Sequence, residues 1–596
     1  MKRTGLSKYK ESFSLTLLTS RCDYTIIRTI DKYEILLVSF DDMKYRHKIL
    51  QLIKEIEVGE FIINRHGVFY RDVRDEVEER ILVCSPLLVT GITRNKDGND
   101  WGKLLVFADP EGHEKQYHMS SSKGQNVVIS DLVHRGLVLS SNSRSRHLLA
   151  QYLRSAPSPR MMLSSSMPGW VKHSFVLPYR SFGPDEVVYS GDGNTGFGVQ
   201  GNWKNNVGKL CSGNSRLIFA ASVAFAAPLM RVMNIEGGGF HFRGDSSKGK
   251  TTALQVAASV CGKVATSPGE DSYLLNWKST ANSFEEVAQS HNDCLMVIDE
   301  LGQADAKTVG DICYMLANGQ GKARMGHAKR SWRVMFITSG EISLAEQMAR
   351  AGEKVMIGQE IRLLEISTDC SAEQGLFEDV HRSKTPAEFS NRIKRATANH
   401  YGTPLQKFLE HLTSNTEAVE TRCRSYMDVF LKSVLPPNAT GVVPRAALRF
   451  ALVAAAGELA TRLKLTGWRK GEAFRAAKKC FGSWMEHHRT FDPVAMAVDR
   501  VQRFIMENNA KFEIVGGNVR LNGSKVGYQK KDRFLILPNV FRDSVCAGAD
   551  PEAVANALEH AGYLNTSGPN RKKKQERIQG QLGYFYSVPG SILKAE

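Results

Sequence analysis

The sequence predicts an α/β protein whose central region is preceded by a β-rich α+β region and followed by helices. Two observations carry this fold class: strand-like and helical patterns alternate over residues 201–375, and a glycine-rich turn joins one such strand to the next helix. The expected parts are a small segment of unknown role at 1–60, a β-rich domain at 61–200, an α/β domain at 201–375, a helical lid or linker at 376–490 and a compact C-terminal unit at 491–596.

The composition describes a packed, basic protein. Hydrophobic residues make up 42% of the 596 positions and charged residues 24%, which is typical of globular proteins. The net charge of +17 favours a polyanionic partner. Ten scattered cysteines without a C-x-x-C pair argue against a zinc ribbon or a disulfide framework and suit a reducing cytosol. The chain begins without a signal-peptide pattern, and its most apolar run, Leu217–Met230, is too short to cross a bilayer. We therefore expect a cytoplasmic protein with no membrane partner.

Short apolar strands dominate the region from 61 to 200. The pairs Asp97-Gly98 and Glu111-Gly112 stand between strand-like runs, as hairpin turns do. Asp72, Asp75 and Glu76 lie close together, but such charge runs are usually solvated faces. Polymerising activity is therefore not expected. A DNA-binding collar, a primase-like remnant and a partner-docking domain all remain open for this region.

The glycine-rich turn of the central region has the G-x-x-x-x-G-K-T pattern of a phosphate-binding loop. Glycines let backbone N–H groups turn onto phosphates, and the helix that follows adds partial positive charge at its N-terminus. We expect Lys250 to reach the β- and γ-phosphates of ATP and the Thr251 hydroxyl to ligate Mg²⁺. The expected nucleotide contacts are Gly244, Asp245, Ser246, Ser247, Lys248, Gly249, Lys250, Thr251 and Thr252. A glycine-rich turn without a ligand is the alternative.

Two later strands end in polar residues. The first ends in Asp299 and Glu300, about fifty residues after the phosphate loop. We expect Asp299 to lie in the Mg²⁺ shell and Glu300 to polarise the attacking water. The second ends with Thr338 and Ser339, and one of these two is expected to sense the γ-phosphate. The alternative for each run is a buried strand that meets a surface turn.

A glycine-rich basic loop, residues 318–330, lies between these two strands. A loop of this kind suits a hairpin that touches nucleic-acid phosphates. The expected contacts are Lys322, Arg324, Lys329 and Arg330. A solvated basic loop is the alternative.

Arg362 stands at the start of the next strand. In oligomeric ATPases an arginine there can reach the γ-phosphate of a neighbouring subunit and stabilise the charge that develops in transfer. An ordinary ion pair is the alternative.

The last hundred residues predict helices followed by a basic hairpin, which suggests a winged helix. Asp550, Pro551 and Gly562 are placed as the N-cap, first residue and terminator of one helix. The expected phosphate contacts on the hairpin are Arg571, Lys572, Lys573 and Lys574. A structural wing with a solvated tip is the alternative.

Many ordered runs resemble the helicase-like family called domain of unknown function 927. They are Gly213–Ala220, Ala224–Met230, Glu236–Leu254, Tyr314–Lys322, Trp332–Glu341 and Gly358–Leu363, with Cys84–Leu87 and Gly169-Trp170 upstream. The resemblance covers roughly residues 65 to 590 and leaves residues 1–60 outside. One departure is the loop Met325–Ser331, which is shorter than the family pattern and puts the reach of the hairpin in question.

The family occurs on bacterial phages, plasmids and genomic islands and is similar to minichromosome-maintenance and superfamily-three helicases. The resemblance therefore implies an α/β P-loop NTPase (AAA+-like) core and a homo-hexameric ring that moves on single-stranded or forked DNA. It gives Lys322 and Arg324 the role of a pre-sensor hairpin and Arg362 that of a finger reaching the neighbouring subunit.

The leading functional hypothesis is an ATP-dependent DNA helicase or translocase that replicates a mobile element. A nucleic-acid-binding regulator that uses ATP as a switch, without unwinding, also fits the phosphate loop. A small-molecule P-loop kinase is a third hypothesis, which the long basic C-terminal region disfavours.

Overall fold

The computed structural model describes residues 25–26, 36–37, 50 and 53–594, except 159, 192–195, 266, 268, 279, 323–329, 354–356, 371–373, 436–441, 490–492, 518–524, 548 and 569–570. The chain divides into two compact units. The first comprises residues 1–166 and 171–192, and the second comprises residues 167–170 and 193–596. Each unit is described separately below, and the finer division into five parts stays a prediction.

The first unit contains a four-stranded antiparallel sheet and a five-stranded mixed sheet. The first has the order β3 (Ile56–Val58), β4 (Phe61–Asn64), β5 (Gly67–Arg74) and β6 (Val77–Cys84). The second has the order β14 (Val187–Tyr189), β10 (Met161–Ser165), β7 (Leu87–Arg94), β8 (Gly102–Ala108) and β9 (Glu114–Ser120). Short strands complete the unit: β1 (Thr25–Ile26), β2 (Leu36–Leu37), β12 (Ser174–Leu177) and β13 (Arg180–Phe182). The strand content predicted for this region is confirmed.

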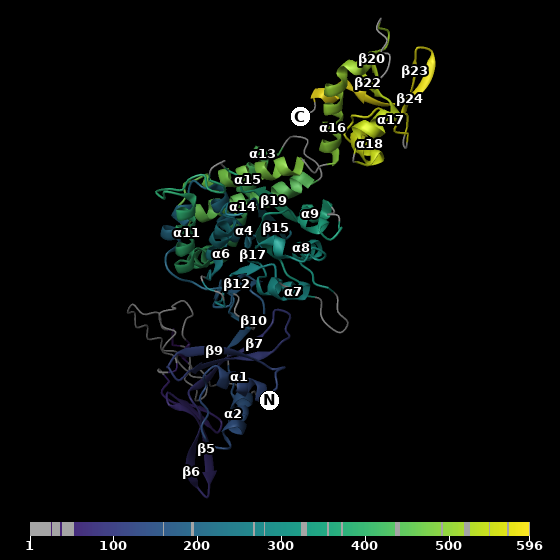
Figure 1. The fold of residues 1–596 in the computed structure, drawn as a ribbon. Coiled ribbons are helices and arrows are strands. Elements are labelled where there is room, and N and C mark those ends of the chain that lie inside the picture. Colours follow the sequence, from purple (N-terminus) through teal and green to yellow (C-terminus); the bar gives the residue numbers. More distant parts are fainter. Residues whose placement is uncertain are drawn as a thin grey trace, which may run out of the picture. The chain divides into compact units, whose positions relative to one another are not determined.

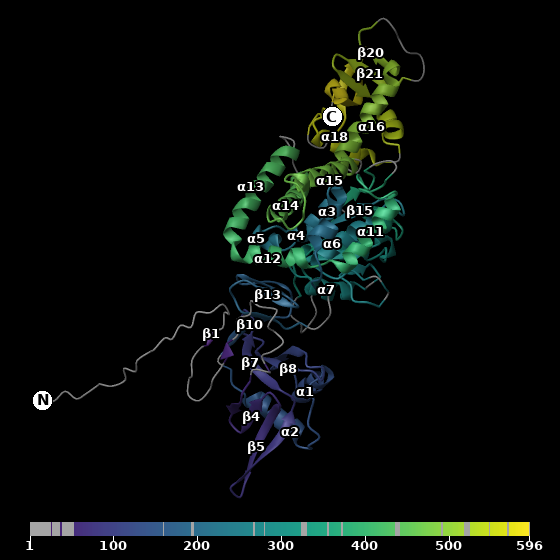
Figure 2. The ribbon, with the colours of Figure 1, turned by 90° about the vertical axis from the view of Figure 1, so that its left-hand side faces the viewer.

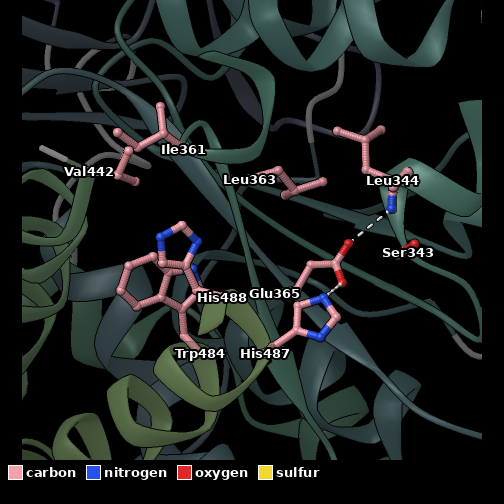
Figure 3. A pocket seen from close by; sticks show the side chains of 10 residues that line it. Ser343, Leu344, Ile361, Leu363, Glu365, Val442, Trp484, His487 and His488 are labelled. Atoms are coloured by element: carbon pink, nitrogen blue, oxygen red, sulfur yellow. Dashed lines mark hydrogen bonds and ion pairs between the residues drawn. The ribbon is translucent and has the colours of Figure 1, made fainter. Parts of the chain in front are cut away.

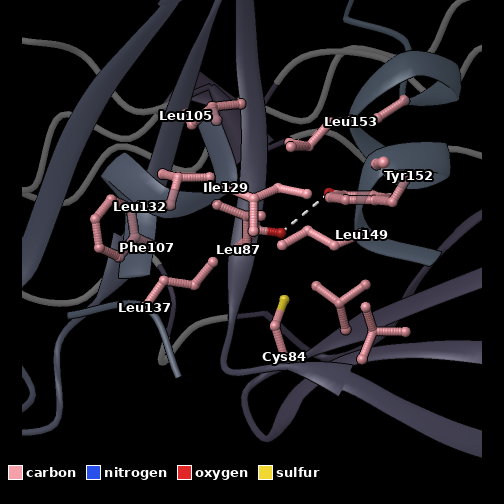
Figure 4. Close-up of a cluster of buried hydrophobic side chains, with 14 of the residues drawn as sticks. Cys84, Leu87, Leu105, Phe107, Ile129, Leu132, Leu137, Leu149, Tyr152 and Leu153 are labelled. Atoms are coloured by element: carbon pink, nitrogen blue, oxygen red, sulfur yellow. Dashed lines mark hydrogen bonds between the residues drawn. The ribbon is translucent and has the colours of Figure 1, made fainter. Parts of the chain in front are cut away.

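Two helices, α1 (Gln125–His134) and α2 (Ser145–Ser155), close the core of the first unit. The α2 side chains Leu149, Tyr152 and Leu153 are buried among strand residues (Figure 4). The Tyr152 hydroxyl donates to the Leu87 carbonyl oxygen at 3.0 Å, so the one polar atom of this ring is satisfied inside the core.

The second unit is built on a five-stranded parallel sheet (Figure 1). Its order is β16 (Leu274–Asn276), β17 (Leu295–Asp299), β18 (Met335–Gly340), β15 (Gly238–Arg243) and β19 (Leu363–Ser367). The buried strand β17 is apolar up to its last residue, and β18 begins with an apolar run, as expected where helices cover both faces of a parallel sheet. The surrounding segments are β11 (Gly169–Val171), α3 (Lys209–Cys211), α4 (Ser215–Ala226), α5 (Leu229–Val232), α6 (Lys250–Cys261), α7 (Ala281–Ser290), α8 (Val309–Asn318), α9 (Leu344–Ala349) and α10 (Ile357–Glu360). The α/β class predicted for this region is confirmed.

Five helices follow the sheet: α11 (Pro386–Asn399), α12 (Thr403–Ser414), α13 (Thr416–Val434), α14 (Val442–Arg462) and α15 (Glu472–Arg489). The alanine-rich α14 is the most buried of these because small side chains let it pack against α4, α13 and α15 at once (Figure 2). Pro444 lies in its first turn, where the missing N–H costs no hydrogen bond. The apolar run Leu217–Met230 is buried and lies in α4, in α5 and in the two residues between them. Among the described residues, no helix is both long and apolar enough to span a membrane.

The residues from 493 onward have a core of their own. The helices are α16 (Pro493–Asn508), α17 (Pro538–Val540), a π-helical turn (Phe541–Val545) and α18 (Pro551–His560). The sheet has the order β20 (Phe512–Ile514), β21 (Gly527–Lys530), β22 (Arg533–Ile536), β24 (Gln581–Pro589) and β23 (Lys574–Ile578). The predicted cap is confirmed, since the Asp550 carboxylate accepts from the Glu552 N–H at 3.1 Å and Pro551 is the first helical residue.

Candidate functional site

The carboxyl ends of β15, β17 and β18 meet at one edge of the parallel sheet. Strand β15 pairs with β18 from Gly238–Met335 to Arg243–Gly340, and β17 pairs with β18 up to Ile298–Thr338. In open parallel sheets, ligands bind at this edge because the loops that leave the strands converge there.

The loop after β15, residues 244–249, leads directly into α6. Gly249 caps the helix with a φ of +91°, a conformation that glycine adopts without strain, and Ser247 has a φ of +63°. A Cβ at Gly244 would lie 1.9 Å from the Thr368 hydroxyl oxygen, so this position has no room for a side chain. Asp245, Ser246 and Ser247 are exposed at the tip. Lys248 is half-buried, with its ammonium 3.9 Å from Asp369. The two pattern glycines are therefore required by the geometry of the loop.

Lys250 is almost entirely buried at the start of α6. Its ammonium donates to the carbonyl oxygens of Gly244, at 2.7 Å, and Asp245, at 2.6 Å, so the side chain folds back over the loop. Thr251 is half-buried beside it. The Thr252 hydroxyl lies 2.6 Å from the Ser390 hydroxyl of α11, so it faces that helix instead of the loop.

Asp299 and Ser339 form a hydrogen-bonded pair across the ends of β17 and β18. The fully buried Ser339 hydroxyl donates to Asp299 Oδ1. The Glu300 N–H donates to the same carboxylate oxygen at 3.1 Å. One carboxylate oxygen is thus held by two donors, which keeps the Asp299 side chain in a defined orientation at the sheet edge.

Glu300 follows Asp299 with a φ of +61°, an uncommon conformation for a residue other than glycine. Burial raises the pKa of its carboxyl above the usual value, and the neighbouring charges of Asp299 and Glu341 act in the same direction, whereas Lys250 opposes them. A carboxylate with a raised pKa is a better proton acceptor than an ordinary surface glutamate.

Thr338 and Ser339 project to opposite faces of β18 because successive strand residues alternate. The Thr338 hydroxyl accepts a hydrogen bond from Trp277 Nε1 at 2.7 Å inside the core. Thr338 and Ser339 were the two candidates for sensing the γ-phosphate. Ser339 contacts Asp299, whereas Thr338 accepts a hydrogen bond from the buried indole of Trp277.

His241 is a buried residue of β15 that the sequence patterns did not single out. Its Nε2 lies 3.0 Å from the Ile342 carbonyl oxygen, and burial lowers the pKa of the imidazole. A Cβ on Gly340 would lie 3.1 Å from its ring, so the histidine supports the loop that follows β18. The sequence offered one signal for this residue, a histidine between two phenylalanines in a predicted strand.

A pocket beside β19 lies among Glu365, Leu344, Trp484 and His487 (Figure 3). Glu365 Oε1 accepts from the Leu344 N–H at 3.0 Å, and Oε2 lies 2.7 Å from His487 Nε2 of α15. Burial raises the pKa of this carboxyl, but the bond from His487 and the charge of His241 outweigh burial, so the pKa lies below its usual value. This contact between Glu365 and His487 ties α15 to β19.

The basic loop between β17 and β18 has a hairpin base. The Trp332 N–H donates to the Gly319 carbonyl oxygen, the Gly321 N–H donates to the Arg330 carbonyl oxygen, both at 3.0 Å, and Gln320 pairs with Ser331 in an antiparallel bridge. Arg324, Lys329 and most of the loop Met325–Ser331 lie outside the described residues.

Two glutamates of α7 hold the two sides of this base. The buried Glu285 carboxylate accepts from the backbone N–H of Lys322 at 3.1 Å, and Glu286 lies 3.3 Å from the Arg330 guanidinium. The Lys322 side chain itself is exposed.

Arg362 lies at the amino end of β19, away from the phosphate loop. Its guanidinium donates to Asn318 Oδ1 at 2.9 Å and to the Gly358 carbonyl oxygen at 2.6 Å, and it lies 4.2 Å from the centre of the Tyr314 ring. Residue 362 is six positions before Thr368, which touches Gly244. Six strand residues span about 20 Å, so Arg362 cannot reach the phosphate loop of its own chain.

The basic run near the C-terminus begins the hairpin of β23 and β24. Lys572 is bonded to Glu559 of α18, and the Lys573 ammonium lies 5.9 Å from the centre of the Tyr586 ring. Arg571 is exposed, and Lys574 is the first residue of β23. These four basic residues are consecutive in the chain. They are distant in sequence from the residues at the carboxyl ends of β15, β17 and β18.

Residues 61–331 match the family model described as Domain of unknown function (DUF927), which confirms the resemblance predicted from the motifs over that range. A solved structure described as "SCCmec type IV Cch - active helicase" is similar to this chain, with a TM-score of 0.59 and 18% identity. The match covers 91% of this chain and 100% of that chain. At this identity the likeness bears on the fold alone. No curated protein matches.

Proposed function

We propose that this protein is an ATP-dependent DNA helicase or translocase with a P-loop NTPase core of AAA+-like type. The observation that carries the proposal is the convergence of the Lys250 ammonium, the Asp299–Ser339 pair and the Glu300 carboxyl at one edge of the sheet. A cation for the phosphates, a carboxylate for Mg²⁺ and a second carboxylate for water are the groups that phosphoryl transfer to water needs.

The residues at this edge suit Mg²⁺ and ATP. Gly244 has no room for a Cβ, and Gly249 adopts a positive φ. A loop that presents backbone N–H groups to phosphates requires such glycines. The Thr251 hydroxyl and the Asp299 carboxylate are oxygen ligands of the kind that Mg²⁺ prefers. When bound, the ion would neutralise charge on the phosphates.

Each protein group has a distinct role in this mechanism. Lys250 would exchange its two loop carbonyl partners for oxygens of the β- and γ-phosphates. Glu300 would orient a water and accept its proton, a role for which a raised pKa is suited. Ser339 would hold Asp299 in the orientation that ligates the metal.

The site would be completed by a second copy of the chain. Because Arg362 lies about 20 Å along β19 from its own phosphate loop, a phosphate that it contacts belongs to a neighbouring subunit. The proposed assembly is therefore a homo-oligomer, and a hexameric ring is the form that the family resemblance of the motifs implies.

DNA would bind at the hairpin that begins at Gly319 and at the C-terminal basic run. The base of the hairpin that begins at Gly319 is antiparallel and is held by α7. This base supports a hairpin whose residues Lys322, Arg324, Lys329 and Arg330 contact DNA and move with it. The C-terminal helices and hairpin support a winged-helix domain at 491–596. The likeness to a protein named as an SCCmec helicase supports a helicase of a mobile element, and the proposal places its work in replication of such an element in the cytoplasm. The other parts are the 1–60 segment, the β-rich domain at 61–200, the ATPase domain at 201–375 and the helical lid at 376–490.

Strand displacement on a forked DNA duplex tests the proposal. Purified protein should hydrolyse ATP, hydrolyse it faster with single-stranded DNA, and open the fork as a particle whose mass is six chains. Hydrolysis by a confirmed hexamer that opens no fork would favour the ATP-switched regulator. A protein that neither binds nor hydrolyses ATP would contradict both.

A further inference from the structure

The hairpin of β23 and β24 presents one face whose side chains are set by the strand register. The two-residue turn Gln579-Gly580 has φ values of +49° and +86°, as a tight hairpin turn requires. Gln575 pairs with Tyr584, and Arg577 pairs with Leu582. Directly paired residues of antiparallel strands lie on the same face, so Tyr584 and Leu582 share a face with Gln575 and Arg577.

This face runs from the core into solvent. Val588 and Tyr586 are buried, and the Tyr586 ring stacks on Phe541 with the ring centres 3.8 Å apart. The next two side chains on the same face of β24 are uncovered: Tyr584 is 58% exposed and Leu582 is 61% exposed. Figure 1 shows the two strands as one hairpin at the end of the chain. An aromatic ring and an apolar side chain thus project from a paired strand and remain open to a ligand.

Positive charge flanks the exposed ring. Arg577 is exposed opposite Leu582, and the exposed Lys573 lies beside the ring of Tyr586. The acid of this strand, Glu576, points to the other face and is held there by Lys530 at 2.7 Å and Arg533 at 3.2 Å. The cations on the Tyr584 face are therefore not neutralised by Glu576.

The helix before the hairpin has a different character. The residues of α18, Pro551–His560, include no lysine or arginine. Its exposed side chains include Glu552, Asn556 and His560. A helix that enters a duplex groove lies between two phosphate backbones and is usually basic, so α18 does not favour duplex binding.

We infer that the exposed face of the β23–β24 hairpin is a binding platform for unpaired bases of single-stranded DNA. Tyr584 stacks on a base, Leu582 extends the apolar surface, and Lys573 and Arg577 contact the adjoining phosphates. Aromatic rings beside cations bind single strands in this way because every base has a π-face. The inference deepens the proposed function and rests on it for the identity of the ligand as DNA.

Binding of full-length protein to base-bearing and fully abasic single strands of equal length tests this platform. The phosphates are the same in both strands, so the ratio of the two affinities isolates the contribution of the bases. Tyr584→Ala should weaken binding of the base-bearing strand about tenfold and leave the abasic strand unaffected, whereas Tyr584→Phe keeps the ring and the preference. Met506→Ala is the matched control, because Met506 is 62% exposed on α16 and lies outside the hairpin.

Photocrosslinking supplies a local measurement. A single strand carrying 5-iodouracil should crosslink to the peptide that contains Tyr584, and a fully paired duplex should not. Three results would each overturn the inference: Tyr584→Ala binds both single strands as wild type does, Tyr584→Ala loses affinity equally for both, or the crosslinks lie only in other peptides. The exposed face would then be left to a protein partner. ATP hydrolysis measured without DNA reports on the proposed function separately, since its absence would contradict that function and not the preference for bases.

Discussion

Ser339 donates its hydroxyl hydrogen to the Asp299 carboxylate across the ends of two adjacent parallel strands. The bond joins β17, which leads into Asp299 and Glu300, to β18, which carries Thr338 and Ser339. It fixes the orientation of the Asp299 side chain from inside the protein. The neighbouring Thr338 contacts Trp277 on the opposite face of the same strand.

The two adjacent hydroxyls should therefore respond differently to mutation. Ser339→Ala should lower the rate of ATP hydrolysis about 10- to 100-fold with little change in melting temperature, because it frees a metal ligand from its supporting bond. Thr338→Val should instead lower the free energy of unfolding by about 1–3 kcal/mol, because the Trp277 N–H loses its buried acceptor. Steady-state hydrolysis and thermal unfolding of both variants check this contrast. A selective loss of hydrolysis in Thr338→Val would reverse the assignment.

Lys250→Ala should reduce ATP hydrolysis by about 100-fold or more, since one preorganised cation at the phosphates is lost. Nucleotide binding, followed by titration calorimetry, should weaken as well. Lys263→Ala is a matched control, because Lys263 follows α6 and forms a half-exposed ion pair with Glu270 at 3.1 Å. Turnover of the wild-type rate in Lys250→Ala would be incompatible with the proposed site.

Glu300→Gln should abolish hydrolysis and leave folding intact. The pKa of Glu300 is raised in the folded protein, so its contribution to stability is present below the unfolded pKa and is lost as pH rises through the folded pKa. At neutral pH the charged carboxylate is thus unfavourable in the fold, and the neutral amide should keep or increase the melting temperature.

The wild-type pH profile gives a second measurement on Glu300. Hydrolysis should decline on the acid side at a pH above 4.5, the ordinary value for a glutamate, because the carboxyl must be ionised to accept a proton. An acid limb at or below that ordinary value would argue that another group sets the profile.

Arg362→Ala should lower hydrolysis by about 1,000-fold or more in an assembled ring, because a finger from the neighbouring subunit stabilises transferred charge. The geometry permits a sharper experiment: Arg362→Ala and Lys250→Ala chains, each inactive, should regain part of the activity when mixed. A subunit with an intact Lys250 would then meet a neighbour with an intact Arg362. Mixtures that remain inactive although the chains co-assemble would indicate that Arg362 acts within its own chain through Tyr314 and Asn318.

Local patterns predicted much of the central region. The strands, the glycine turn and the helix at Lys250 follow from residues adjacent in sequence, and each lies where its pattern placed it. The choice between Thr338 and Ser339 did not follow, because strand alternation says only that they face opposite ways and not which face meets Asp299. Thr252 faces Ser390 because the position of α11, remote in sequence, decides what that side of α6 contacts.

The sequence by itself determined the groups available for chemistry: a lysine in a glycine loop, two acids after a buried strand, and basic runs at two places. It also carried the match of residues 61–331 to the family model. Only the tertiary structure decided which groups meet. The order of the five parallel strands places β18 between β15 and β17, so that the ends of all three meet, and it sets Arg362 at the opposite end of β19. In the C-terminal sheet, Tyr584 stays uncovered beyond the core. The parallel sheet pairs strands that are distant in the sequence, and spacing along the chain does not specify which of them become neighbours.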